Sequence, residues 1–155
     1  MEKKQKPGTP TLNNRKARHE YSIVESYEAG LVLTGTEIKS LRQGNANFGD
    51  SFAYIKKGEI WLKEFYIKPF EQGSYNNHEP RRERKLLLQR YEIRKIDRAV
   101  SQKGITLVPL RLYFKKGLAK LELGLARGKK KHDKRASIAL KDSKREMERE
   151  MRGKK

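Results

Sequence analysis

The stretch LVPLRLYFKKGLAKLELGLARG, residues 107–128, decides the fold of this chain. The apolar side chains of residues 110–114 alternate with polar ones, and the leucines of residues 121–125 alternate in the same way. A period of two places the apolar side chains on one face of a β-strand. Between these runs, Lys115-Lys116-Gly117 predicts a tight turn, because glycine adopts positive φ without steric cost. The stretch therefore predicts an antiparallel hairpin, in which Pro109 marks an edge or a bulge.

Further β-strands are predicted on the amino-terminal side of this hairpin. Residues 51–67 contain two runs rich in β-branched and aromatic residues around Gly58, which is placed to form the turn of another hairpin. A first strand is expected from Tyr21, with a bend or bulge at residues 28–30. Residues 68–80 contain the Pro, Gly, Ser and Asn typical of a long loop.

Two segments carry the start and stop signals of helices. Thr34 and Glu37 have the spacing of a capping box, and Gly44 is placed to end that helix. Residues 89–102 place isoleucine and valine side chains on one face, and Gly104 is the expected stop.

These elements predict a mainly β fold, a small antiparallel barrel of about six strands with two to three peripheral helices. The polar residues 1–13 are interpreted as a flexible leader, residues 14–126 as the body and residues 127–155 as a basic C-terminal tail. The tail has too few apolar side chains to offset the entropy of ordering it. We therefore expect it to be disordered in the free protein and ordered by a polyanion.

Charge is the strongest guide to the partner. The chain carries a formal net charge of +19 at pH 7, and residues 127–155 hold thirteen Lys or Arg against five Asp or Glu. Such an excess predicts nucleic-acid binding, because solubility alone requires a net charge of only about 2–8. There is no cysteine, no apolar run approaching a membrane helix and no apolar signal segment. The expected compartment is the cytoplasm, without a membrane partner.

The sequence offers little for catalysis. Each histidine precedes an acidic residue, in His19-Glu20, His78-Glu79 and His132-Asp133. Adjacent residues of a strand point to opposite faces, so such a pair does not act together on one proton or one ion. No recognised catalytic or phosphate-binding motif is present. We expect a binding protein, not an enzyme, with no metal and no cofactor.

RNA binding fits the residue types better. Lys and Arg neutralise phosphates and release counterions, while Tyr and His stack on unpaired bases. Lys39 and Arg42 share the exposed face of the predicted helix, where an ordinary solvated pair is an equally open interpretation. Arg84 and Lys85 are assigned to RNA phosphates.

Four stretches of the sequence, in this order and spacing, resemble the SmpB family (small protein B) of bacterial tmRNA-binding proteins. They are NRKARHEY (14–21), YEAGLVLTGTEIKSLRQGNAN (27–47), RRERKLLLQRYEI (81–93) and LVPLRLYFKKGLAKLELGLARGKKKHDKR (107–135). The resemblance implies an oligonucleotide-binding-type barrel and a role in trans-translation. The body would bind the tRNA-like domain of tmRNA as a monomer. The tail would enter the decoding centre and empty mRNA channel of a stalled ribosome, where elongation factor Tu brings alanyl-tmRNA.

The resemblance also implies site residues. Glu28 and Leu87 match family positions that contact tmRNA, and the alternative interpretation of Leu87 is core packing. Gln89 occupies a third such position, where Asn or His is more usual. The full set expected to bind tmRNA is Asn14, Arg15, Lys16, His19, Glu28, Lys39, Arg42, Arg84, Lys85, Leu87 and Gln89.

The same comparison assigns the start of the tail to the ribosome. His132 is at the position expected to stack on a decoding-centre base, and Lys134 and Arg135 are expected to meet phosphates. The full set is Lys129, Lys130, Lys131, His132, Asp133, Lys134, Arg135 and Ile138. A weak apolar stripe beyond it predicts a helix that forms only on the ribosome. The alternative function is a structural ribosomal or ribosome-assembly protein.

Overall fold

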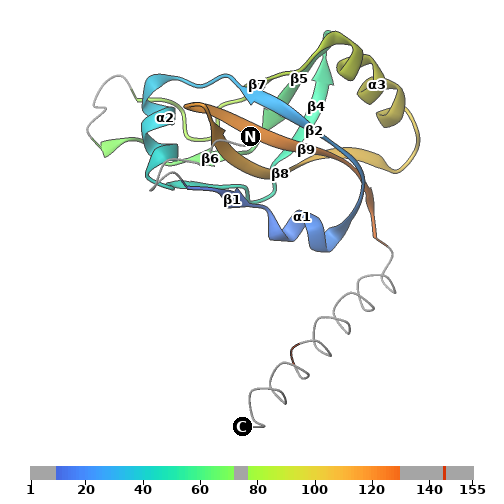
Figure 1. The fold of residues 1–155 in the computed structure, drawn as a ribbon, viewed down its shortest axis with the longest axis horizontal. Coiled ribbons are helices and arrows are strands. Elements are labelled where there is room, and N and C mark those ends of the chain that lie inside the picture. Colours follow the sequence, from blue (N-terminus) through green and yellow to red (C-terminus); the bar gives the residue numbers. More distant parts are fainter. Residues whose placement is uncertain (1–9, 72–76, 130–144, 146–155) are drawn as a thin grey trace.

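A computed structural model describes residues 10–71, 77–129 and 145 of the chain. Its elements, shown in Figure 1, are β1 (Leu12–Asn13), α1 (Arg15–Glu20), β2 (Tyr21–Leu31), α2 (Gly35–Arg42), β3 (Ala46–Asn47), β4 (Phe52–Lys56), β5 (Glu59–Lys63), β6 (Tyr66–Ile67), β7 (Arg84–Leu87), α3 (Arg90–Val100), β8 (Ile105–Lys115) and β9 (Leu118–Gly128).

Six of the strands form a closed antiparallel ring. Their order is β8-β4-β5-β7-β2-β9, and the pairing of β9 with β8 closes it, while β1 joins through β8 and β3 pairs with β6 in a separate two-stranded sheet. The helices lie around this ring, with α2 and α3 at opposite ends of the view in Figure 1. The predicted mainly β fold of about six strands with peripheral helices is confirmed.

Both predicted hairpins are present. Lys57 and Gly58, at φ of 51° and 74°, link β4 to β5, and Lys116 and Gly117, at 52° and 78°, link β8 to β9. Positive φ at both central residues gives a turn whose twist matches that of the flanking strands. At Pro109, where an edge or a bulge was predicted, the structure has a bulge: the register shifts between Pro109 and Arg111.

The bulge sends Leu110 to the other side of the sheet. Leu112 and Phe114 lie in the main core inside the ring, whereas Leu110 packs with Ala17 of α1 in a second cluster. The prediction that residues 110–114 share one face is therefore wrong at Leu110. An extra residue in a strand reverses the alternation of the side chains beyond it.

β2 differs from the prediction in where it is irregular. The strand runs without a break over eleven residues, and its register shift lies between Ile23 and Glu25. Residues 28–30, where a bend or bulge was expected, are in regular register with β9, and Gly30 also pairs with β7. Pairing on both edges holds this part of the strand extended, because each backbone group requires a partner.

The two predicted helices are α2 and α3, and each ends before a glycine at positive φ. The capping box of α2 is formed: the Thr34 amide donates to Glu37 Oε1 at 2.9 Å, and the Glu37 amide to Thr34 Oγ1 at 3.4 Å. Gly44 follows at φ 76°, and Gly104 beyond α3 at 87°. Ile96 of α3 is fully buried and joins the core of the ring.

Strand pairing extends past the predicted limits of the body at both ends. Leu12 pairs with Leu112, and Arg127 pairs with Ser22 and with Ile105. Within the described ranges, no helix is both long and apolar enough to cross a membrane.

Candidate nucleic-acid interface

The outer face of β2 and β7 carries the first group of predicted contacts. Gly30 lies directly opposite Leu87 in the ladder, and a Cβ atom on Gly30 would be 3.3 Å from that of Leu87. The leucine lies close against the neighbouring strand and is still 52% exposed. Such exposure excludes the core-packing interpretation of Leu87 and leaves its side chain available for a ligand.

Glu28 lies two residues before Gly30 on the same outward face. Its carboxylate accepts a hydrogen bond from the Tyr113 hydroxyl and pairs with Lys115 Nζ at 3.5 Å. The hydrogen bond from Tyr113, helped by Lys115, lowers the pKa of Glu28 below its ordinary value. Glu28 is therefore ionised at neutral pH and held in one orientation, as an acceptor for base amino groups or ribose hydroxyls requires.

Lys85 and Gln89 flank this group. Lys85 Nζ pairs with Glu59 Oε1 at 2.7 Å and stays partly exposed. Gln89 is the exposed N-cap residue of α3, and its backbone amide donates to Glu92 Oε1 at 3.1 Å. The structure thus gathers Glu28, Lys85, Leu87 and Gln89 on and beside adjacent strands.

Arg84 does not belong to this surface. It is fully buried, and its guanidinium donates to Glu37, to the Phe65 carbonyl at 2.6 Å and to the Pro80 carbonyl at 3.1 Å. The assignment of Arg84 to an RNA phosphate is corrected, because its donors are bound inside the protein. Alternation along β7 turns Arg84 inward and Lys85 outward.

Asn14 is also structural. Its Oδ1 accepts from the Ala17 amide at 3.2 Å, which caps α1, and its Nδ2 donates to the Pro109 carbonyl at 2.7 Å. Only 6% of the residue is exposed. The expected tmRNA contact at Asn14 is replaced by a role in joining α1 to the bulge of β8.

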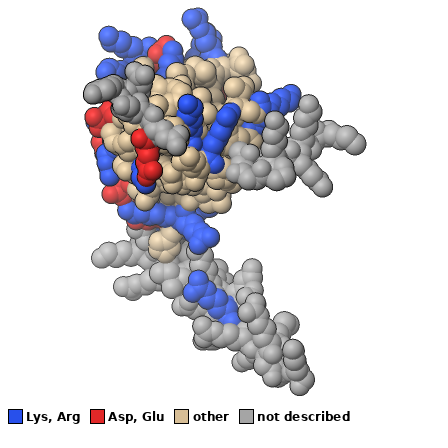
Figure 2. Space-filling model, turned by 90° about the vertical axis from the view of Figure 1, so that its left-hand side faces the viewer, with Lys and Arg blue, Asp and Glu red and all other residues tan. Residues whose placement is uncertain are grey.

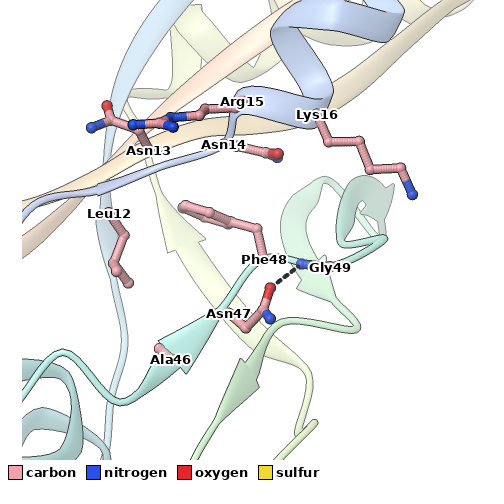
Figure 3. A pocket seen from close by; sticks show the side chains of 9 residues that line it. All are labelled: Leu12, Asn13, Asn14, Arg15, Lys16, Ala46, Asn47, Phe48 and Gly49. Carbon is pink, nitrogen blue, oxygen red and sulfur yellow. Dashed lines mark hydrogen bonds between the residues drawn. The ribbon is translucent and has the colours of Figure 1, made fainter.

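Arg15 and Lys16, from the same amino-terminal group, line a pocket of about 280 Å³. Its lining, drawn in Figure 3, is Leu12, Asn13, Asn14, Arg15, Lys16, Ala46, Asn47, Phe48 and Gly49. The side chains of Arg15 and Lys16 extend in opposite directions there, and Lys16 pairs with Asp50. His19 lies half-buried farther along α1. Arg15 and Lys16 are both exposed, and Lys16 is the one that forms an ion pair with a described residue.

Lys39 and Arg42 are exposed on α2, and Lys39 Nζ lies 5.4 Å from the centre of the Phe70 ring. Figure 2 views the molecule from the side of α2: Lys and Arg project from a largely uncharged surface, and Asp and Glu gather toward one edge. The pair on α2 is separate from the β2–β7 face. The contact of Lys39 and Arg42 with tmRNA stays a prediction.

Of the predicted ribosome contacts, the structure describes Lys129. Its backbone amide donates to the Glu20 carbonyl at 2.9 Å, and its Nζ to the Arg18 carbonyl at 3.4 Å. Lys130, Lys131, His132, Asp133, Lys134, Arg135 and Ile138 lie outside the described residues, as does the predicted helix beyond them.

Sequence reasoning missed the side chains that hold the interface in place. Glu37 is fully buried against Arg82 and Arg84, and Tyr113 orients Glu28. In the sequence, the capping box already accounted for Glu37, so no further pattern indicated its ion pairs with Arg82 and Arg84.

In the described ranges, no three His, Cys, Asp or Glu side chains gather as metal ligands would. His78 instead bonds Thr36 Oγ1 at 2.9 Å and the Ile67 carbonyl at 3.0 Å.

Comparison with known proteins decides the family. The sequence model of the family described as SmpB protein matches residues 11–153, nearly the whole chain. This chain belongs to the SmpB protein family. Among curated SmpB relatives, the SsrA-binding protein of Desulforudis audaxviator is 55% identical over 148 residues, covering 96% of this chain and 97% of the relative. The SsrA-binding protein of Thermobifida fusca is 55% identical over 152 residues, covering 98% and 94%.

A solved structure agrees with this SmpB assignment. A chain in the structure described as "tmRNA-SmpB: a journey to the center of the bacterial ribosome" is 56% identical to this one. The match covers 79% of this chain and 87% of that chain, with a TM-score of 0.68. At this identity and TM-score, the two chains share a fold.

Proposed function

We propose that this chain binds tmRNA and acts in trans-translation, the rescue of ribosomes that have stalled without a stop codon. Membership of the SmpB family carries the proposal, since the relatives are named SsrA-binding proteins and the similar solved chain belongs to a tmRNA–SmpB structure on the bacterial ribosome. The net charge of +19 supports it, because phosphate neutralisation supplies much of the affinity for RNA.

The body binds the tRNA-like domain of tmRNA with the β2–β7 face. Leu87 offers an exposed apolar surface to a base or ribose, and Glu28 accepts from amino or hydroxyl groups beside it. Lys85 neutralises a phosphate near the same point. An ionised, oriented carboxylate favours specific contacts over general attraction to RNA, because it repels phosphates that arrive in another register.

The C-terminal segment then occupies the decoding centre and the empty mRNA channel. Its Lys and Arg excess suits a channel lined by ribosomal RNA, and His132 is the residue proposed to stack on a base. Elongation factor Tu delivers the alanyl-tmRNA that this chain accompanies. The protein contributes binding and position in the cytoplasm, and performs no bond chemistry of its own.

The test is to capture the full chain from its native lysate and sequence the RNA that stays bound. One dominant RNA with a tRNA-like end and an internal reading frame is expected. A broad spread of ribosomal and messenger RNA would overturn the proposal and favour a structural ribosomal or ribosome-assembly protein.

A further inference from the structure

A tyrosine two strands away from Glu28 holds that carboxylate in place. Tyr113 lies on β8 and Glu28 on β2, with β9 between the two strands. In the ladder, Lys120 of β9 is the partner of Tyr113 on one side and of Gly30 on the other. The Tyr113 side chain reaches across the outer face of β9, and its hydroxyl donates a hydrogen bond to Glu28 Oε2.

The ring of Tyr113 is itself held by its surroundings. Its neighbours on both sides in β8 are buried in the core, so the alternation of the strand directs Tyr113 outward. The Arg111 guanidinium lies 4.5 Å from the centre of the ring, and Arg111 Nε pairs with Glu122 Oε2 at 3.2 Å. Burial, together with the hydrogen bond to Glu28, raises the pKa of Tyr113. The hydroxyl is therefore protonated at neutral pH and acts as a donor.

The other charged groups around Glu28 hold it less firmly. Lys115 Nζ is 3.5 Å from Oε1, which is longer than an ordinary hydrogen bond. Lys120 adds only its charge, and Glu122, directly opposite Glu28 in the ladder, repels it. The Tyr113 hydroxyl makes the largest contribution to the lowered pKa of Glu28. It is thus the group that gives the carboxylate a direction.

This hydrogen bond contributes more to binding than to folding. The Glu28 side chain is 41% exposed, so water can replace the tyrosine as donor at little cost to stability. A free glutamate side chain, however, loses rotamer entropy when a ligand fixes it. Because Tyr113 orders the carboxylate in the folded protein, that entropy is not lost again when RNA binds.

We propose that Tyr113 is a positioning residue for tmRNA binding, which fixes the Glu28 carboxylate for the tRNA-like domain and acts on RNA affinity through Glu28 alone. The inference rests on the proposed function, since it deepens the role of the β2–β7 face. The ligand is the tRNA-like domain because Glu28 shares that face with the exposed Leu87, through which this domain is proposed to bind.

The experiment titrates the full chain with a transcript of the tRNA-like domain and compares four proteins in a double-mutant cycle. They are the unaltered chain, Tyr113→Phe, Glu28→Ala and the combination of the two substitutions. Tyr54→Phe is the matched control, because the Tyr54 hydroxyl also donates to a carboxylate, that of Glu83, and neither residue is an expected tmRNA contact. Chemical denaturation of each variant checks the fold.

Tyr113→Phe should weaken binding roughly three- to tenfold, the size expected when one flexible side chain must be ordered on binding. In the Glu28→Ala background the same substitution should cause no further loss, because the group that Tyr113 positions is absent. Tyr54→Phe should bind as the unaltered chain does. Tyr113→Phe and Tyr54→Phe should have similar unfolding free energies, since each loses one partly exposed hydrogen bond.

The pH profile of binding gives a second measurement. The hydrogen bond from Tyr113 lowers the pKa of Glu28, so Tyr113→Phe should raise that pKa toward its ordinary value. As the pH falls, Tyr113→Phe should therefore lose RNA affinity at a higher pH than the unaltered chain. Tyr54→Phe should follow the unaltered chain. A substitution that only disturbed packing would not move this midpoint.

Unchanged affinity of Tyr113→Phe would overturn the inference and leave the proposed function intact. An equal loss from Tyr113→Phe with and without Glu28 would also overturn it, because a direct RNA contact or a defect of the fold adds to the loss of Glu28. An unshifted pH midpoint would do the same. If the unaltered chain did not bind the tRNA-like domain, the proposed function would fail and the inference with it.

Discussion

At the scale of single residues, the exposed Leu87 depends on the glycine opposite it. Gly30 has no side chain, so Leu87 can lie close against β2, with only 3.3 Å between its Cβ and the position that a Cβ on Gly30 would take. A larger residue at position 30 would push the leucine away or cover it. The pair therefore sets the shape of the β2–β7 face, and neither residue does so alone.

Replacing Leu87 by Ala should weaken binding of the tRNA-like domain by roughly 1–2 kcal/mol, or about 5- to 30-fold, since full burial of a leucine is worth about 1.5–3 kcal/mol. The free energy of unfolding should change by less than about 0.5 kcal/mol, because the side chain is 52% exposed. Titration with the RNA and chemical denaturation measure the two effects. Leu118→Ala, 62% exposed in the hairpin β8–β9, is the control, and equal losses from both variants would remove Leu87 from the interface.

At position 124 a glycine is needed because the neighbouring side chain of Leu110 leaves no room for a Cβ atom, and not because of its φ angle. A Cβ atom there would lie 2.8 Å from Leu110 Cδ1. Gly124→Ala should therefore lower the free energy of unfolding by about 1–3 kcal/mol, the usual cost of overpacking a core. Gly128→Ala in the same strand meets nothing within 4 Å and should be close to neutral. Urea unfolding of both variants decides, and similar stabilities would contradict the packing argument.

At the scale of elements, Glu37 ties α2 to the segment around β7. One carboxylate completes the capping box of α2 and binds both Arg82, at 2.6 Å, and Arg84. Burial opposes ionisation of Glu37, but the hydrogen bonds from Arg82 and the Thr34 amide, with the charge of Arg84, outweigh it and lower the pKa of Glu37. The ion cluster fixes where β7 lies, and so where Leu87 points.

Glu37→Gln should lower the free energy of unfolding by about 3–5 kcal/mol, because it leaves the buried Arg84 without its counter-charge. Denaturation at pH 7 measures the change. Glu79→Gln is the matched control, because Glu79 is exposed and has no ion pair with a described residue, and it should be nearly neutral.

The same carboxylate predicts a pH dependence. The pKa of Glu37 is lower in the folded than in the unfolded chain, so its contribution is fully present above the unfolded value of about 4.3. It is lost as the pH falls below that value and through the folded pKa. The unfolding free energy of the unaltered chain should fall over this range, and that of Glu37→Gln should fall less. Parallel curves for the two proteins would contradict the role given to Glu37.

At the scale of the whole molecule, the positive net charge is shared by two parts of the chain. One is the body, in which six strands pair in a closed ring, and the other is the basic C-terminal segment. β9 pairs with β2 as far as Gly128 and with β8 as far as Arg127, and the Lys129 amide donates to the Glu20 carbonyl. A truncation that keeps these contacts therefore removes only residues 130–155.

Removal of residues 130–155 should leave binding of the tRNA-like domain within a few-fold and abolish tagging of peptides on stalled ribosomes, because the proposed decoding-centre contacts lie in that segment. RNA titration and a tagging assay on ribosomes without a stop codon measure the two outcomes. A truncation from residue 127 should in addition lower the thermal stability, since Arg127 pairs with Ser22 and Ile105. If tagging were retained without residues 130–155, the proposed role of this segment in the decoding centre would be wrong.

The sequence by itself determined the features that depend on near neighbours in the chain. The glycines of both hairpin turns, the capping box of Thr34 and Glu37 and the bulge at Pro109 each involve a few adjacent residues, so their patterns are local. The charge excess and the four family stretches likewise needed no coordinates to indicate an RNA-binding protein.

Only the tertiary structure decided which residues of these patterns face outward. Leu110 changes sides because a bulge reverses the alternation, and Arg84 turns inward to a carboxylate 47 positions away in the chain. Leu87 is exposed beside Gly30, 57 positions earlier, as their register shows. From its neighbours in the chain, an arginine such as Arg84 is expected to be exposed and a leucine such as Leu87 to be buried. The structure reverses both because Glu37 and Gly30, distant in sequence, supply the contacts that stabilise them. Such contacts follow from strand register, which the closing of the ring sets.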